Sequence, residues 1–222
     1  MKKLRDLLGR GYFPRELPPV FDTTSMRRVA TRASAAPPSF WATGRTSQGC
    51  QHNVPRSGPL RRPLAIPNPI AYTNLCKEID ASWRPISAHI AKSTISKSIP
   101  KFYTAGARAV LPQVPNQADL VPFRAAGRAA GKTILHTDVS RFYNSIYTHS
   151  IPWALHSKLI AKQRRRDYGL LGNRLDRALR NMQDGQTMGI AIGPDASLIV
   201  SEIVLAAVDE SFQRSVRVRG LR

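Results

Sequence analysis

Apolar residues recur at helical spacing in several segments of the chain. In residues 71–93 they recur at intervals of three or four, at Leu75, Ile79, Trp83, Ile86 and Ile90. This spacing predicts an amphipathic helix, which Pro85 would kink or divide. Further helices are expected over residues 1–10, 117–130, 150–165, 170–182 and 198–212.

Two segments have the pattern of β-strands. Residues 108–111 (RAVL) form a short apolar run, and residues 132–139 (KTILHTDV) alternate apolar with polar side chains and lead to Asp138. Asp184-Gly185 predicts a turn. Because strands and helices mix without strict alternation, the expected fold class is α+β.

The composition changes between Pro14 and Pro69, where Pro, Ser, Thr and Arg dominate. No acid occurs between Asp22 and Glu78. The stretch is typical of extended structure laid over a partner surface, of a mobile basic arm, or of a poorly ordered solubilising tail.

The charge balance indicates a polyanionic partner. Lys and Arg number 34 against 14 Asp and Glu, a net charge of +20. Nucleic acid is the favoured partner, because neutralising phosphates releases counterions and gives affinity without base reading. A membrane surface is the rival, but no apolar run of about 18 residues is present.

Cys50 and Cys76 do not form a zinc motif, and no secretory signal is recognisable, so a cytoplasmic location is expected.

The segment around Asp138 has the strongest chemical signal. A hydrophobic strand would deliver this carboxylate at its end, and Phe142 and Tyr143 follow four and five residues later. Magnesium prefers carboxylate oxygens, and the backbone carbonyl of Val139 could supply another ligand. An Asp that caps the following turn is the alternative.

Five blocks of the sequence resemble the reverse transcriptases, especially the bacterial defence-associated and abortive-infection types. The segment TDVSRFYNSIYTHSIPWAL, which contains Asp138, is similar to their motif A. The others are LLGRGYFPRELPPVF and RPLAIPNPIAYTNLCKEI near the N-terminus, GARAVLP with Arg108, and TMGIAIGPDASLIVSEIVL, which is similar to motif B.

The resemblance implies a right-hand polymerase with three parts. Residues 1–65 would be a basic N-terminal extension, 66–132 the fingers, and 133–222 a partial palm. The implied activity is RNA-directed DNA synthesis from deoxynucleoside triphosphates with Mg2+, in phage defence, with an RNA template and a DNA product and without a membrane partner.

Individual roles follow from the same resemblance. Asp138 would be the first catalytic metal ligand. Tyr143 would lie beneath the incoming sugar and exclude a 2′-hydroxyl, unless it is a core aromatic residue. Arg108 would bind the triphosphate, and Arg124 is a second candidate that fits a solvated face equally well.

Two further sets of residues complete the expected site. Ile192 and Gly193 belong to the motif B loop, and Gly193 would let the backbone approach the nucleotide. Arg164, Arg165 and Arg166 would touch the template backbone or form a solvated face. Ala191 departs from the family, in which proline is common at that position.

One expected element is absent from the sequence. Motif C, an aromatic-x-Asp-Asp hairpin, should follow motif B, but the chain contains no Asp-Asp pair. A two-metal site with one carboxylate strand is incomplete, so a C-terminal half carrying motif C is an expected partner. The alternative is a non-catalytic nucleic-acid-binding protein that keeps the polymerase fold.

Overall fold

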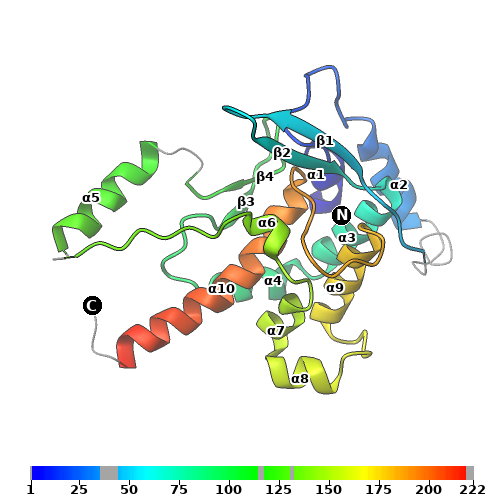
Figure 1. Ribbon diagram of the computed structural model, residues 1–222. Helices are drawn as coiled ribbons and strands as arrows, with labels where there is room; N and C mark the ends of the chain where they lie inside the picture. Colours follow the sequence, from blue (N-terminus) through cyan, green and yellow to red (C-terminus); the bar gives the residue numbers. More distant parts are fainter. Residues whose placement is uncertain (1, 36–44, 115–117, 131–132, 219–222) are drawn as a thin grey trace.

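The computed structural model describes residues 2–35, 45–114, 118–130 and 133–218. Within these residues the structure has helices and two small antiparallel hairpins (Figure 1), which confirms the α+β class. The strands are β1 (Cys50–Pro55), β2 (Arg61–Ile66), β3 (Pro100–Phe102) and β4 (Val110–Pro112). The helices are α1 (Lys2–Arg10), α2 (Met26–Ala35), α3 (Pro69–Ala81), α4 (Trp83–Ile90), η1 (Ala118–Leu120), α5 (Val121–Ala130), α6 (Phe142–Ser145), α7 (Ser150–His156), α8 (Lys158–Gln163), α9 (Leu171–Asn181) and α10 (Asp195–Val218).

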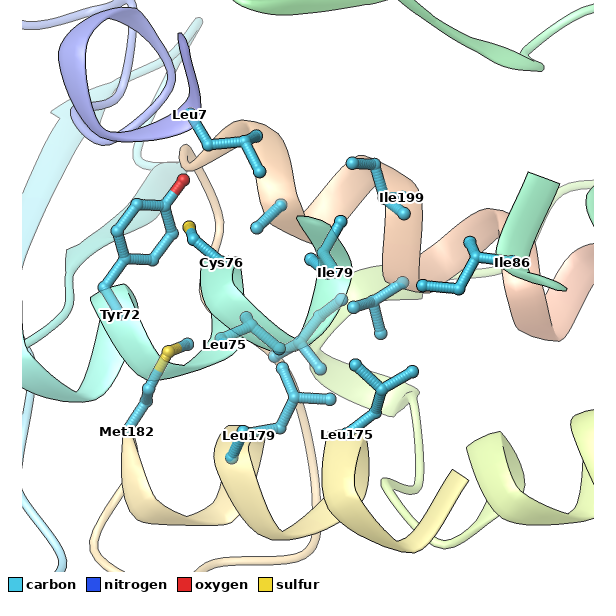
Figure 2. Close-up of a cluster of buried hydrophobic side chains, with 14 of the residues drawn as sticks. Leu7, Tyr72, Leu75, Cys76, Ile79, Ile86, Leu175, Leu179, Met182 and Ile199 are labelled. Carbon is cyan, nitrogen blue, oxygen red and sulfur yellow. The ribbon is translucent and has the colours of Figure 1, made fainter. Parts of the chain in front are cut away.

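Helix α3 lies at the centre of the hydrophobic core. It packs against α1, α9 and the buried first half of α10. Figure 2 shows side chains from these helices meeting: Leu7, Tyr72, Leu75, Cys76, Ile79, Leu175, Leu179 and Ile199. Segments from both ends of the chain contribute to this cluster.

The helix expected over residues 71–93 is divided, as Pro85 indicated. Its first part, α3, begins with Asn68, whose side chain accepts hydrogen bonds from the N–H groups of Ile70 and Ala71. Asn at this position followed by proline is a favoured helix start. Ser82 ends α3, and α4 then carries Pro85 in its first turn, where proline is tolerated.

The N-terminal region is packed rather than free. Leu4, Leu7 and Leu8 of α1 are buried, as their spacing predicted, and Tyr12 and Ala30 join the same core. Helix α2 and the β1–β2 hairpin were not expected from the sequence. The mobile-arm and tail interpretations are therefore wrong for α2 and the hairpin, which are held by strand pairing and by the buried side chains of Ala30 and Leu64. Val20, Phe21 and Leu60 in the same stretch remain exposed.

One further helix prediction differs in detail from the structure, and the next is confirmed. The segment 150–165 is two helices, because Ser157 adopts a positive φ of 73° between α7 and α8. Helix α9 and the turn at Asp184-Gly185, with φ values of 54° and 77°, confirm the remaining pattern. Among the helices in the described ranges, none is long and apolar enough to cross a membrane.

Candidate nucleotide and nucleic-acid site

Arg108 and Asp195 form a buried ion pair between the predicted fingers and motif B. The Arg108 guanidinium also donates hydrogen bonds to the carbonyl oxygens of Phe13, at 2.5 Å, and Gly193, at 2.7 Å. The two side chains are only 14% and 4% exposed. Three parts of the sequence therefore meet at one guanidinium.

The Asp195 carboxylate has further partners. Its second oxygen accepts hydrogen bonds from the N–H groups of Ala109 and Val110, each at 2.9 Å. Burial raises the pKa of Asp195, while Arg108 and these hydrogen bonds oppose that rise. A buried carboxylate is tolerated only when it is paired in this way.

Two glycines allow the chain segments to approach at this point. Gly193 has a φ of 127°, and a Cβ there would lie 2.4 Å from Pro14 Cγ. A Cβ on Gly11 would lie 2.7 Å from Asp195 Oδ2, and the Gly11 carbonyl accepts a hydrogen bond from the Asp195 N–H at 2.7 Å. We call residues 11–14, 108–110 and 193–195 the Arg108–Asp195 junction.

Tyr143 lies next to the segment that resembles motif B and packs against the hydrophobic core. It is half-buried on α6 against the core, and its hydroxyl shares a hydrogen bond with Ser201 of α10. Burial raises the pKa of the Tyr143 hydroxyl. Its carbonyl accepts a hydrogen bond from Ile190 N–H at 2.9 Å, so α6 and the segment before motif B are joined directly.

An open groove of about 320 Å³ runs between β1–β2 and residues 182–192. The Ala65 N–H donates to the Ile192 carbonyl at 2.9 Å and closes one end. Five amide side chains line the groove, those of Gln48, Gln51, Asn144, Gln183 and Gln186. Among its described lining residues Asp184 is the one charged group, so the groove presents hydrogen-bonding amides rather than cations.

Asp138 has very different surroundings. Residues 133–139, here called the Asp138 segment, form an exposed coil between α5 and α6 (Figure 1) instead of the predicted strand. No described strand lies beside them to pair their backbone groups. Leu135 is 85% exposed and Val139 56% exposed. The strand predicted from the alternating pattern is therefore not formed, and no neighbouring strand is present among the described residues to pair with it.

The other basic candidates lie on the surface. Arg124 is exposed on α5. Arg164, Arg165 and Arg166 are exposed at the end of α8 and line a shallow hollow of about 410 Å³. Arg164 forms an ion pair with Asp167. The structure thus brings four of the predicted site residues into one region: Arg108, Tyr143, Ile192 and Gly193. Asp138, Arg124 and Arg164–Arg166 lie on the surface outside that region.

Sequence reasoning missed Asp195 and Ser201 as the partners of Arg108 and Tyr143. The available signal was that Asp195 comes two residues after Gly193, at the start of an otherwise apolar helix. Searches of the chain against protein-family models and against curated proteins found no match. The resemblance to reverse transcriptases therefore stays a prediction that rests on the sequence blocks.

Proposed function

We propose that this chain is the fingers and partial palm of an RNA-directed DNA polymerase of the bacterial defence type. The supporting observation is that the resembling blocks contact one another. Arg108 bonds to Gly193, Tyr143 to Ile190, and Ala65 to Ile192, although each pair is far apart in sequence. Contacts of this kind are what a nucleotide site assembled from several segments requires.

In this proposal Tyr143 forms the wall that excludes a ribose 2′-hydroxyl. Its ring is fixed by core packing and its hydroxyl by Ser201, so the wall is rigid. Arg108 already donates to Phe13, Gly193 and Asp195. Its contribution is therefore to position the motif B loop, in addition to any contact with a triphosphate.

The metal site is the incomplete part of the proposal. Two-metal catalysis needs several carboxylates that clamp the attacking and leaving oxygens. Around Asp138, and in the rest of the described chain, no group of three or more candidate ligands comes together. The residues present do not fit two Mg2+ ions, so the proposal assigns the other carboxylates to a polypeptide that carries motif C.

A second candidate is a nucleic-acid-binding protein without catalysis. The specific observation in its favour is that Arg108 is committed to a buried ion pair while Asp138 is solvent-exposed. Both candidates predict binding of single-stranded RNA and DNA with little sequence preference. The affinity should fall with salt, by a slope of roughly −0.7 per phosphate contact on a log–log plot.

Primer extension on an RNA template separates the two candidates. The purified chain alone should not extend a primer with labelled deoxynucleotides. Adding the polypeptide encoded directly downstream, fused or separate, should produce Mg2+-dependent DNA synthesis. A mixture that binds the template but synthesises no DNA would favour the non-catalytic candidate.

A further inference from the structure

Tyr147, His149 and Trp153 form an aromatic cluster on the surface, outside the nucleotide region. The Tyr147 ring lies 4.9 Å from His149 and 5.6 Å from Trp153, measured between ring centroids, and both contacts are edge-on. The Lys158 ammonium lies 4.9 Å from the centre of the Trp153 ring. Tyr147 remains 36% exposed, so part of this side chain is accessible to a ligand.

The local structure fixes these rings in place. Tyr147 bridges to Met188 in an antiparallel arrangement, and the Thr148 N–H donates to the Thr187 carbonyl at 2.8 Å. His149 then precedes α7, and Trp153 follows one turn later. A ring that stands on an ordered backbone and contacts two other rings loses less conformational entropy when a ligand stacks on it.

The Tyr147–Met188 bridge also links the cluster to the groove. Met188 is 58% exposed and lines the groove near Asn144. The backbone pairing of Tyr147 with Met188 therefore places the aromatic cluster beside the groove in the fold.

Charge favours a nucleic acid as the occupant. Residues 150–181, which form α7 to α9, contain eight Lys and Arg against two Asp. Both acids are neutralised internally: Asp167 pairs with Arg164, while Asp176 pairs with Arg180 and lies 3.0 Å from His149 Nδ1. Arg174 also pairs with Glu78. Lys158, Lys162, Arg165 and Arg166 remain as exposed cations on the same stretch as the rings.

The geometry points to a stacking site for the bases of a single-stranded nucleic acid at Tyr147, His149 and Trp153. Lys158 begins α8 and the run Arg164–Arg166 follows its end, about 9 Å further along at 1.5 Å per residue. These cations hold phosphates while Tyr147 stacks on a base, which is the usual combination at sequence-tolerant single-strand sites. The inference extends the proposed function but needs only its nucleic-acid binding, not its chemistry.

The test is fluorescence anisotropy with a short fluorescein-labelled single-stranded RNA. Tyr147→Ala should weaken binding about tenfold, since stacking on an aromatic side chain is lost. Tyr147→Phe should bind like the wild type because the ring is kept. Tyr103→Ala is the matched control, because Tyr103 is 37% exposed and lies on the loop between β3 and β4.

A second measurement does not depend on how the Tyr147 variants fold. RNA should quench the tryptophan emission of the wild type, and the part due to Trp153 should disappear in Trp153→Phe. Equal affinity of Tyr147→Ala and the wild type, or quenching unchanged in Trp153→Phe, would overturn the stacking site alone. A wild-type chain that binds no RNA at low salt would overturn the proposed function as well.

Discussion

The Arg108–Asp195 junction and the Asp138 segment are both assigned to the nucleotide site by resemblance, but their surroundings are opposite. In the junction, Asp195 is 4% exposed and accepts hydrogen bonds from a guanidinium and two backbone N–H groups. In the Asp138 segment, Leu135 is 85% exposed and no described strand pairs with the backbone.

The difference indicates which part of the site the chain can form by itself. The junction is held by contacts between its own segments, and its geometry should persist without ligand. The Asp138 segment has apolar side chains in water and backbone groups that no described strand pairs with, which favours association with another polypeptide. We therefore expect mutations to be costly in the junction and nearly neutral for folding in the Asp138 segment.

The largest expected effect is that of Asp195→Ala. It leaves the N–H groups of Ala109 and Val110 buried without their acceptor. It also removes the carboxylate that neutralises the Arg108 guanidinium, which keeps only carbonyl acceptors. The free energy of unfolding should fall by about 3–5 kcal/mol, measured by urea denaturation followed by circular dichroism. Asp209→Ala is the control, because that carboxylate accepts one hydrogen bond from Ser93, worth about 1 kcal/mol. An equal loss of unfolding free energy in the two variants would contradict the claim that the Arg108–Asp195 junction stabilises the fold more than an ordinary hydrogen bond does.

Gly193→Ala should have the next largest effect. Its positive φ and the close contact of the new Cβ with Pro14 should together cost about 2 kcal/mol of unfolding free energy. Gly106→Ala separates the two causes, since Gly106 has a φ of 96° but a Cβ added there would meet no atom within 4 Å. Gly193→Ala should be the more destabilising in thermal and urea unfolding. The close approach of Pro14 would be irrelevant if both variants lost the same stability.

Glu202→Gln should increase stability at neutral pH. Burial raises the pKa of Glu202 on α10, while hydrogen bonds from Ser98 and Ser96 oppose the rise. Because the folded pKa lies above the unfolded pKa, the wild type loses stability as pH rises between them. The variant should therefore gain about 1 kcal/mol over the wild type at pH 7 and less at pH 4. Urea unfolding at both pH values tests this. A larger gain at pH 4 than at pH 7 would contradict a raised pKa of Glu202 in the folded state.

The smallest effect on folding is expected for Leu135→Lys. Its side chain is already exposed, so the free energy of unfolding should change by no more than about 0.5 kcal/mol. Self-association through the Asp138 segment should nevertheless decrease, as measured by sedimentation velocity. Val20→Lys is the control, since Val20 is 80% exposed elsewhere. A similar decrease in both variants would mean that general charge, and not this segment, controls association.

Local patterns in the sequence predicted the elements that depend on local contacts. The helical spacing of Leu4, Leu7 and Leu8, the division near Pro85 and the turn at Asp184-Gly185 were all confirmed. The strand expected before Asp138 was wrong, because a strand needs a neighbour and alternation alone does not supply one.

Contacts between distant segments could not be predicted in the same way. The basic stretch after Pro14 gave no sequence pattern that predicts α2 or the β1–β2 hairpin. Its Arg- and Pro-rich composition is instead typical of a mobile arm. The pairing of Arg108 with Asp195 joins residues 87 positions apart. Only the folded chain shows that Asp195, which follows the motif B glycine, is the acceptor.

Primer extension with Asp138→Asn tests the central claim most directly. The chain would be combined with the polypeptide encoded downstream, an RNA template and labelled deoxynucleotides, and the initial rate of DNA synthesis measured. Asp22→Asn is the matched control, because Asp22 is an exposed aspartate whose described partner is Thr24. We predict Mg2+-dependent synthesis by the wild type and by Asp22→Asn, and none by Asp138→Asn. Equal rates for wild type and Asp138→Asn would contradict the assignment of Asp138 as a catalytic metal ligand.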